Sequence, residues 1–77
     1  MQRLIIDIGN SSAKAATFEG DNLVWHVRVE HAELPELLAA KAQDASIGSA
    51  ILSSVIPLSE SLEEAVMALP FPCLRMS

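Results

Sequence analysis

The run from Asp7 to Lys14 contains the side chains best suited to bind a charged ligand. It reads Asp-Ile-Gly-Asn-Ser-Ser-Ala-Lys and continues an apolar, β-branched run that begins at Leu4. A carboxylate in an apolar strand needs local hydrogen-bond donors or a nearby cation, because its desolvation is costly. Gly9 lets a backbone approach closely, successive N–H groups can surround phosphate oxygens, and Lys14 adds a positive charge. This pattern indicates a phosphate-binding turn.

A second interpretation of the same run is purely structural. Asp7 then caps a tight hairpin through an Asx-type hydrogen bond, and Lys14 is a solvated strand residue. An Asp-x-Gly-Asn pattern has only three fixed positions, so the residues alone leave both interpretations open.

The other polar candidates are isolated in the sequence. His26 alternates with apolar neighbours and has no partner at metal-ligand spacing, which favours an exposed strand residue. His31 is interpreted as a loop or helix-entry residue, and Trp25 as a core residue or an interface anchor. Cys73 lies in the run Phe-Pro-Cys-Leu and is expected to be a small buried apolar residue.

The elements that position these residues follow from the hydrophobic periodicity. Alternating or continuous β-branched runs predict strands and the i, i+3, i+4 spacing predicts helices, with Pro35 in a first turn. Ser61 and Glu64 have capping-box spacing for the second helix, with Ser59 as the alternative cap. The first strand is expected to be buried on both faces. Strands are predicted over 2–8, 13–18, 23–29, 50–56 and 71–76, and helices over 34–43 and 58–69.

The predicted order is therefore β-β-β-α-β-α-β, an α/β fold. Short turns join the first three strands into an antiparallel meander, whereas helical crossovers place the last two strands parallel. A mixed sheet results. The last strand ends with the 77 residues, as expected for a truncated domain.

Composition excludes several classes of protein. With 77 residues, 51% hydrophobic, the chain forms at most one small domain, and some of its apolar surface is expected to face a partner. A net charge of −5 with five scattered basic residues excludes a binder of the nucleic-acid backbone. The longest uncharged run, 45–58, is too short and too polar for a membrane span. The early carboxylate at Asp7 and the single cysteine favour a cytoplasmic protein.

Two segments resemble a known family. Asp-x-Gly-Asn-Ser with a lysine four residues after the asparagine, followed by a three-strand meander, resembles the first phosphate-binding motif of type III pantothenate kinases. These enzymes belong to the superfamily of acetate and sugar kinases, heat-shock chaperone ATPases and actin. The segment 50–57, which ends Ser-Val-Ile-Pro, is similar to the strand-and-turn segment of the same family.

This resemblance implies a ribonuclease-H-like, actin-like ATPase half-domain, with ATP bound between two such halves and a homodimer built mainly by the second half. It implies phosphorylation of pantothenate to 4′-phosphopantothenate, the first step of coenzyme A biosynthesis, with Mg²⁺ and a monovalent cation, K⁺ or NH₄⁺. Asp7 would help to hold the metal. The residues implied to bind the nucleotide are Asp7, Gly9, Asn10, Ser11, Ser12 and Lys14.

Other parts of the family's active site are missing from these residues. The Gly-x-Asp-Arg substrate motif, the aspartate general base and the second nucleotide motif do not occur in the sequence. Residues 1–77 are therefore expected to be the N-terminal nucleotide-binding subdomain, without a catalytic residue, inactive alone and partnered by a C-terminal half. The alternatives are a non-catalytic ATP-binding regulatory or transcription-accessory module of the same fold, and a plain interaction module.

Overall fold

The computed structural model describes residues 1–76, and its elements follow the order β-β-β-α-β-α-β that the periodicity predicts. The helix α1 ends two residues earlier than expected, and a short 3₁₀ turn precedes it. The last strand starts only after Pro72, which has no N–H to donate to the sheet. The elements are β1 (Gln2–Ile8), β2 (Ala13–Glu19), β3 (Asn22–Val29), η1 (His31–Glu33), α1 (Leu34–Lys41), β4 (Ile47–Ser54), α2 (Glu60–Met67) and β5 (Cys73–Met76).

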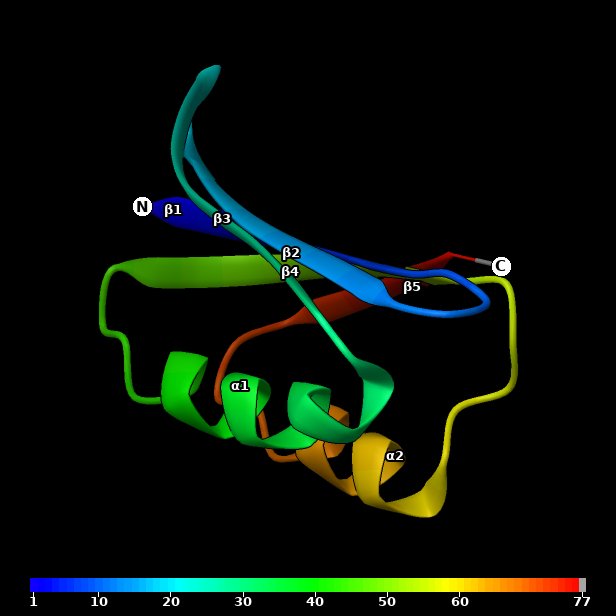
Figure 1. The fold of residues 1–77 in the computed structure, drawn as a ribbon. Coiled ribbons are helices and arrows are strands. Elements are labelled where there is room, and N and C mark those ends of the chain that lie inside the picture. Colours follow the sequence, from blue (N-terminus) through cyan, green and yellow to red (C-terminus); the bar gives the residue numbers. More distant parts are fainter. Residues whose placement is uncertain (77) are drawn as a thin grey trace.

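The five strands form one mixed sheet in the order β3-β2-β1-β4-β5. The central strand β1 pairs antiparallel with β2 and parallel with β4. On the outside, β3 pairs antiparallel with β2, and β5 pairs parallel with β4. Because β1 and β4 run in the same direction, their carboxyl ends lie together, with Asp7 opposite Ser53. The β1–β2 loop and the segment after β4 therefore share one edge of the sheet (Figure 1).

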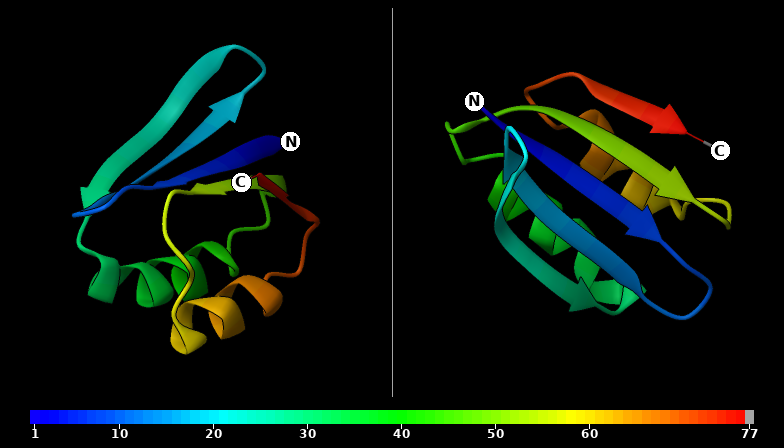
Figure 2. Two further views of the ribbon diagram at one scale, coloured as in Figure 1. Left: turned by 90° about the vertical axis from the view of Figure 1, so that its right-hand side faces the viewer. Right: turned by 90° about the horizontal axis from the view of Figure 1, so that it is seen from above.

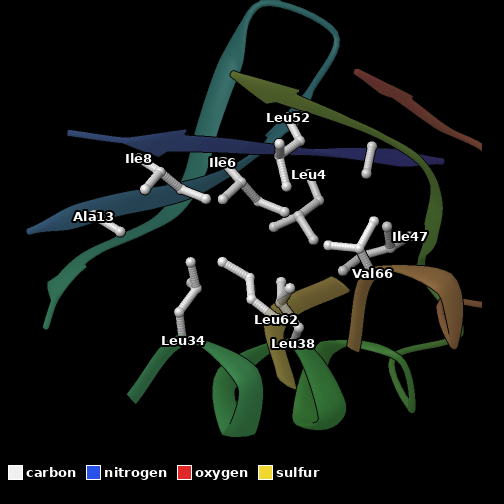
Figure 3. Packing of buried hydrophobic residues seen from close by; sticks show 11 residues of the cluster. Leu4, Ile6, Ile8, Ala13, Leu34, Leu38, Ile47, Leu52, Leu62 and Val66 are labelled. Carbon is white, nitrogen blue, oxygen red and sulfur yellow. The ribbon is translucent and has the colours of Figure 1, made fainter. Parts of the chain in front are cut away.

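Both helices cover the same face of the sheet (Figures 1 and 2). Alternate residues of the strands point to this face, and each helix contributes residues four apart, so that one core forms between the two layers. Figure 3 shows these side chains meeting between sheet and helices. The core comprises Leu4, Ile6, Ile8, Ala13, Leu34, Leu38, Ile47, Ala50, Leu52, Leu62 and Val66.

The opposite face of the sheet is covered by no helix of the described residues (Figure 2). The expectation that β1 is buried on both faces is therefore wrong: Arg3 and Asp7 are exposed and Ile5 is half-buried. Burial on both faces requires a layer on each side, and α1 and α2 pack on the same side. We call this surface the open face. Alternation and strand register place on it Arg3, Ile5, Asp7, Lys14, Ala16, His26, Arg28, Ile51, Ser53 and Leu74.

The helix ends show how local chemistry sets the boundaries. Helix α2 begins at Glu60 because the Ser59 hydroxyl accepts a hydrogen bond from the Leu62 backbone N–H at 3.3 Å. The capping box expected from Ser61 and Glu64 is wrong, since Ser61 already lies in the first turn. Pro35 occupies the first turn of α1, as predicted. No helix within residues 1–76 is long and apolar enough to cross a membrane.

Trp25 ties the outer strand β3 to the helical layer. Its ring is half-buried and packs against the core, and the Lys41 ammonium of α1 lies 3.7 Å from the ring centroid. A cation at this distance is attracted by the negative face of the aromatic ring. Trp25 is thus a core residue, one of the two roles that its sequence context allows.

Candidate functional site

The loop between β1 and β2, residues 9–12, leaves several backbone donors without an acceptor in the described residues. The Gly9 N–H donates to the Ser12 carbonyl at 2.9 Å and closes the hairpin. The N–H groups of Asn10, Ser11 and Ser12 donate to no acceptor within residues 1–76. A Cβ atom at Gly9 would lie 3.3 Å from the Ser12 carbonyl oxygen, so glycine suits this tight closure. The loop therefore presents successive free N–H groups, as an anion-binding turn requires.

The residues predicted to bind phosphate all line one hollow of about 210 Å³ beside this loop. One further residue, Arg28 of β3, completes its wall. We call this the hairpin hollow. It is lined by Asp7, Gly9, Asn10, Ser11, Ser12, Lys14 and Arg28. The structure thus brings together all the residues predicted to bind phosphate and adds Arg28, a second cation from outside the motif.

The charged side chains of the hollow form a row across three strands. In the sheet register, Lys14 of β2 lies opposite Asp7 of β1 and opposite Arg28 of β3. None of the three takes part in an ion pair in the described part of the chain, where the ion pairs are Met1 with Glu19 and Glu63 with Arg75. The row carries one negative and two positive charges, so it has an excess of positive charge.

The environment of Asp7 matches neither the desolvated carboxylate nor the hairpin cap expected from the sequence. It is exposed, so the expectation of a desolvated carboxylate is wrong for this chain, because nothing covers the open face above it. Its side chain makes no hydrogen bond within residues 1–76, so it does not cap the hairpin, which the Gly9 backbone closes instead. Its carboxylate is free to bind a cation.

His31 contacts the backbone of the loop, a role that the sequence analysis did not find. Its Nε2 atom lies 2.8 Å from the Gly9 carbonyl oxygen, and the imidazole is half-buried at the start of η1. The meander register explains this position, because Val29 at the end of β3 pairs with Ala13 at the start of β2. The chain therefore returns to the loop two residues before His31, which agrees with its predicted place at a helix entry.

The segment resembling the second family motif lies next to the first. Ser53 is the β4 partner of Asp7, and the Val55 N–H donates to the Ile8 carbonyl at 3.1 Å. The Ser54 hydroxyl donates to the Ile56 carbonyl at 2.6 Å and accepts from the Ile56 N–H at 3.2 Å. Ser54 thus builds the turn after β4, whereas Ser53 lies on the open face beside the Asp7 carboxylate.

A larger and more apolar hollow of about 620 Å³ extends along the open face from the hairpin hollow. Ile5, Ala16 and Leu23 contribute apolar surface, and His26 lies at its side. His26 is exposed, as expected from its strand pattern. The two hollows share Asp7, Lys14 and Arg28. A ligand held at the loop can therefore extend over the sheet.

Cys73 and the glutamates of α2 lie outside both hollows. Cys73 is half-buried rather than fully buried, because it begins the edge strand β5. Burial raises the pKa of the Cys73 thiol above its ordinary value, and the positive charge of Arg75 opposes this only in part. Glu63 forms an ion pair with Arg75 at 2.6 Å and joins α2 to the sheet.

The hairpin hollow suits a metal ion only together with an anionic ligand. Asp7 is the single carboxylate that lines it, and no group of three or more His, Cys, Asp or Glu residues within 1–76 is placed to hold a metal. Mg²⁺ is commonly bound by one or two carboxylates together with substrate phosphates and water. The residues present therefore fit a Mg²⁺ ion shared between Asp7 and bound phosphates, but not a site formed by protein ligands alone.

Neither a scan against protein-family models nor a search of curated proteins found a match for this chain. The hairpin hollow and its charges are therefore the features on which a functional proposal rests.

Proposed function

We propose that this chain is the N-terminal nucleotide-binding subdomain of a type III pantothenate kinase, a ribonuclease-H-like half-domain that holds the phosphates of ATP. The whole enzyme would transfer a phosphoryl group to pantothenate and form 4′-phosphopantothenate. One observation carries the proposal. The six residues between Asp7 and Lys14 that are proposed to bind the nucleotide all line the same hollow. The mixed sheet and its element order agree with the fold that the motif resemblance implies.

Each part of the hollow has a defined task in this proposal. The free N–H groups of residues 10–12 donate to phosphate oxygens, and Lys14 neutralises part of their negative charge. Asp7 would help to hold a Mg²⁺ ion, which would supply further neutralisation of charge. Phosphoryl transfer depends mainly on such positioning and electrostatic stabilisation. We assign no residue within 1–76 to the monovalent cation, K⁺ or NH₄⁺.

The apolar surface of the open face is evidence that a second layer packs on this half-domain. Ile5, Ile51 and Leu74 form an apolar band across three strands, and Leu74 is exposed. A contiguous exposed apolar patch commonly marks an interface. In our proposal a C-terminal half shares the cleft, supplies the substrate motif and the general base, and forms the homodimer of a cytoplasmic enzyme.

The binding part of the proposal is tested by adding ATP and Mg²⁺ to the ¹⁵N-labelled chain. We expect the amide signals of Gly9, Asn10 and Ser11 to shift first, and Lys14→Gln to weaken binding several-fold by removing a phosphate contact. Arg3→Gln is the matched control, because Arg3 is an exposed cation of the same face that lines neither hollow. Shifts confined to α2, or equal losses in both variants, would contradict the proposed site.

The catalytic part is tested with the longer protein that we propose contains this chain. Pantothenate-dependent formation of ADP is expected, and Lys14→Gln should lower its kcat/KM for ATP while Arg3→Gln should not. ATP binding at the loop without any pantothenate-dependent ADP formation would instead favour the non-catalytic ATP-binding module.

A further inference from the structure

We propose that Arg28 is a second anion-binding residue of the hairpin hollow, and that Lys14 and Arg28 together bind one doubly charged phosphate group. The inference rests on the proposed function in taking the loop as a phosphate site. It goes further because Arg28 lies on β3, outside the motif run, and nothing in the sequence pattern assigns it a role. The ligand class is a phosphate dianion, whether free or at the end of a larger molecule.

The first argument is the pairing of two cations. Lys14 and Arg28 are direct partners on the antiparallel strands β2 and β3, and both are exposed on the open face. Directly opposed residues have Cβ atoms about 4.5–5.5 Å apart, and like charges in such a pair destabilise the sheet. Of the two cations only Lys14 lies opposite Asp7, so one positive charge of the row stays uncompensated. An anion between the two cations removes this repulsion.

The second argument is the distribution of charge over the molecule. The chain has a net charge of −5, with ten acidic and five basic residues. Three of the five basic residues, Arg3, Lys14 and Arg28, lie on the open face, whereas Asp7 is the only acidic residue that the described strand register places there. The open face is therefore positive on an acidic protein, and this asymmetry attracts anions toward the hollow.

The third argument concerns which anion fits. A guanidinium presents a planar fork of donors that matches two oxygens of one phosphate, whereas an ammonium acts as a point charge. The two cations and the loop with its free N–H groups line the same hollow, so their donors can act on one ligand together. A carboxylate has only one charge and two oxygens, so it leaves part of this donor set unused. A phosphate dianion uses both cations and the loop.

Inorganic phosphate is the probe that tests the inference, because it carries no base or sugar. We would titrate the ¹⁵N-labelled chain at constant ionic strength of about 0.1 M and follow the amides of the loop and the Arg28 side-chain signals. Removal of one charged hydrogen-bonding group should weaken binding about five- to tenfold in Arg28→Gln and in Lys14→Gln. Arg28→Lys keeps the charge but loses the fork, and should weaken binding about two- to threefold.

Arg3→Gln is the matched control. It removes the same charge from the same face, but Arg3 lies four residues from Asp7 along β1, about 13 Å away and beyond the Debye length of about 10 Å at this ionic strength. Its affinity for phosphate should equal that of the original chain. All of these side chains are exposed, so the variants are expected to fold.

The possible outcomes separate this inference from the proposed function. If Arg28→Gln binds phosphate like the original chain while Lys14→Gln is weakened, the loop site stands and the role of Arg28 is refuted. Equal losses in Arg28→Gln and Arg3→Gln indicate attraction by net charge alone and also refute it. If phosphate moves no loop amide in the original chain, both the inference and the proposed phosphate site are wrong.

Discussion

Replacement of Asp7 by asparagine gives the sharpest test of how charge is arranged in the hairpin hollow. The change keeps the size of the side chain and removes one negative charge beside Lys14. Because the carboxylate repels an anion in the absence of a metal, we expect ATP without Mg²⁺ to bind Asp7→Asn more tightly than the original chain. With Mg²⁺ present the order should reverse, since Asp7 is the only carboxylate of the hollow that can share the ion.

The size of the first effect follows from the geometry. Neighbouring strands lie about 4.8 Å apart, so an anion held by Lys14 and the loop lies roughly 7 Å from the Asp7 carboxylate. In a solvent-exposed hollow with a dielectric constant near 80, each unit charge contributes about 0.6 kcal/mol at this distance. For two charges, partly screened by salt, roughly 0.5–1 kcal/mol remains, which corresponds to about two- to fivefold tighter binding.

Binding is measured by ATP titrations with and without Mg²⁺, and unfolding by thermal melting of the same samples. Asp21→Asn, in the exposed turn at the far end of the β2–β3 hairpin, controls for the change in net charge. The melting temperature of Asp7→Asn should stay close to that of the original chain, because the carboxylate is exposed and makes no hydrogen bond. If Asp7→Asn weakens ATP binding without Mg²⁺, or lowers stability by more than about 1 kcal/mol, this account of the carboxylate is refuted.

Three further predictions concern the residues around the site and the fold. His31→Ala should speed amide exchange in the hairpin loop by removing its contact with the loop carbonyl, whereas unchanged exchange would show that the imidazole does not hold the loop. Ser59→Ala should destabilise the chain by about 1 kcal/mol in thermal or urea unfolding, and Ser61→Ala by much less; the reverse order would restore Ser61 as the cap. Alkylation of Cys73 should have a pH midpoint above that of a cysteine in an unfolded peptide, because burial raises the pKa of its thiol; an equal midpoint would contradict this.

The strand and helix order was predictable because each element has a clear period. Trp25 and Val27 alternate with exposed residues on β3, and Leu34 and Leu38 lie one helical turn apart on α1. The boundaries were less predictable. Two serines near the start of α2 had acceptable capping patterns, and only the backbone conformation at Ser59 decides between them.

The candidate site was predictable where its residues are contiguous and not where the sheet brings them together. The motif run from Asp7 to Lys14 stands out because a carboxylate, a glycine and a lysine interrupt an apolar pattern. Arg28 and His31 follow much later, with no local feature that marks them. They reach the hollow only because the register of β2 and β3 returns the chain to the loop, and that register includes a one-residue shift between Thr17 and Phe18. The hairpin turn alone would not have placed them, because without this shift Lys14 would lie opposite Val27.

The exposure of the Asp7–Lys14–Arg28 row links the site to the proposed partner half. In this chain water surrounds the three side chains, so each interaction with a bound phosphate is weakened by a high dielectric constant. A second half that covers the apolar band of Ile5 and Ile51 would also exclude water from the adjacent row, because both lie on the same face of β1 and its neighbours. The attraction of the two cations for phosphate, and of Asp7 for Mg²⁺, would then strengthen together. The arrangement therefore predicts weak phosphate binding by the uncovered face and much tighter binding once a partner closes over it.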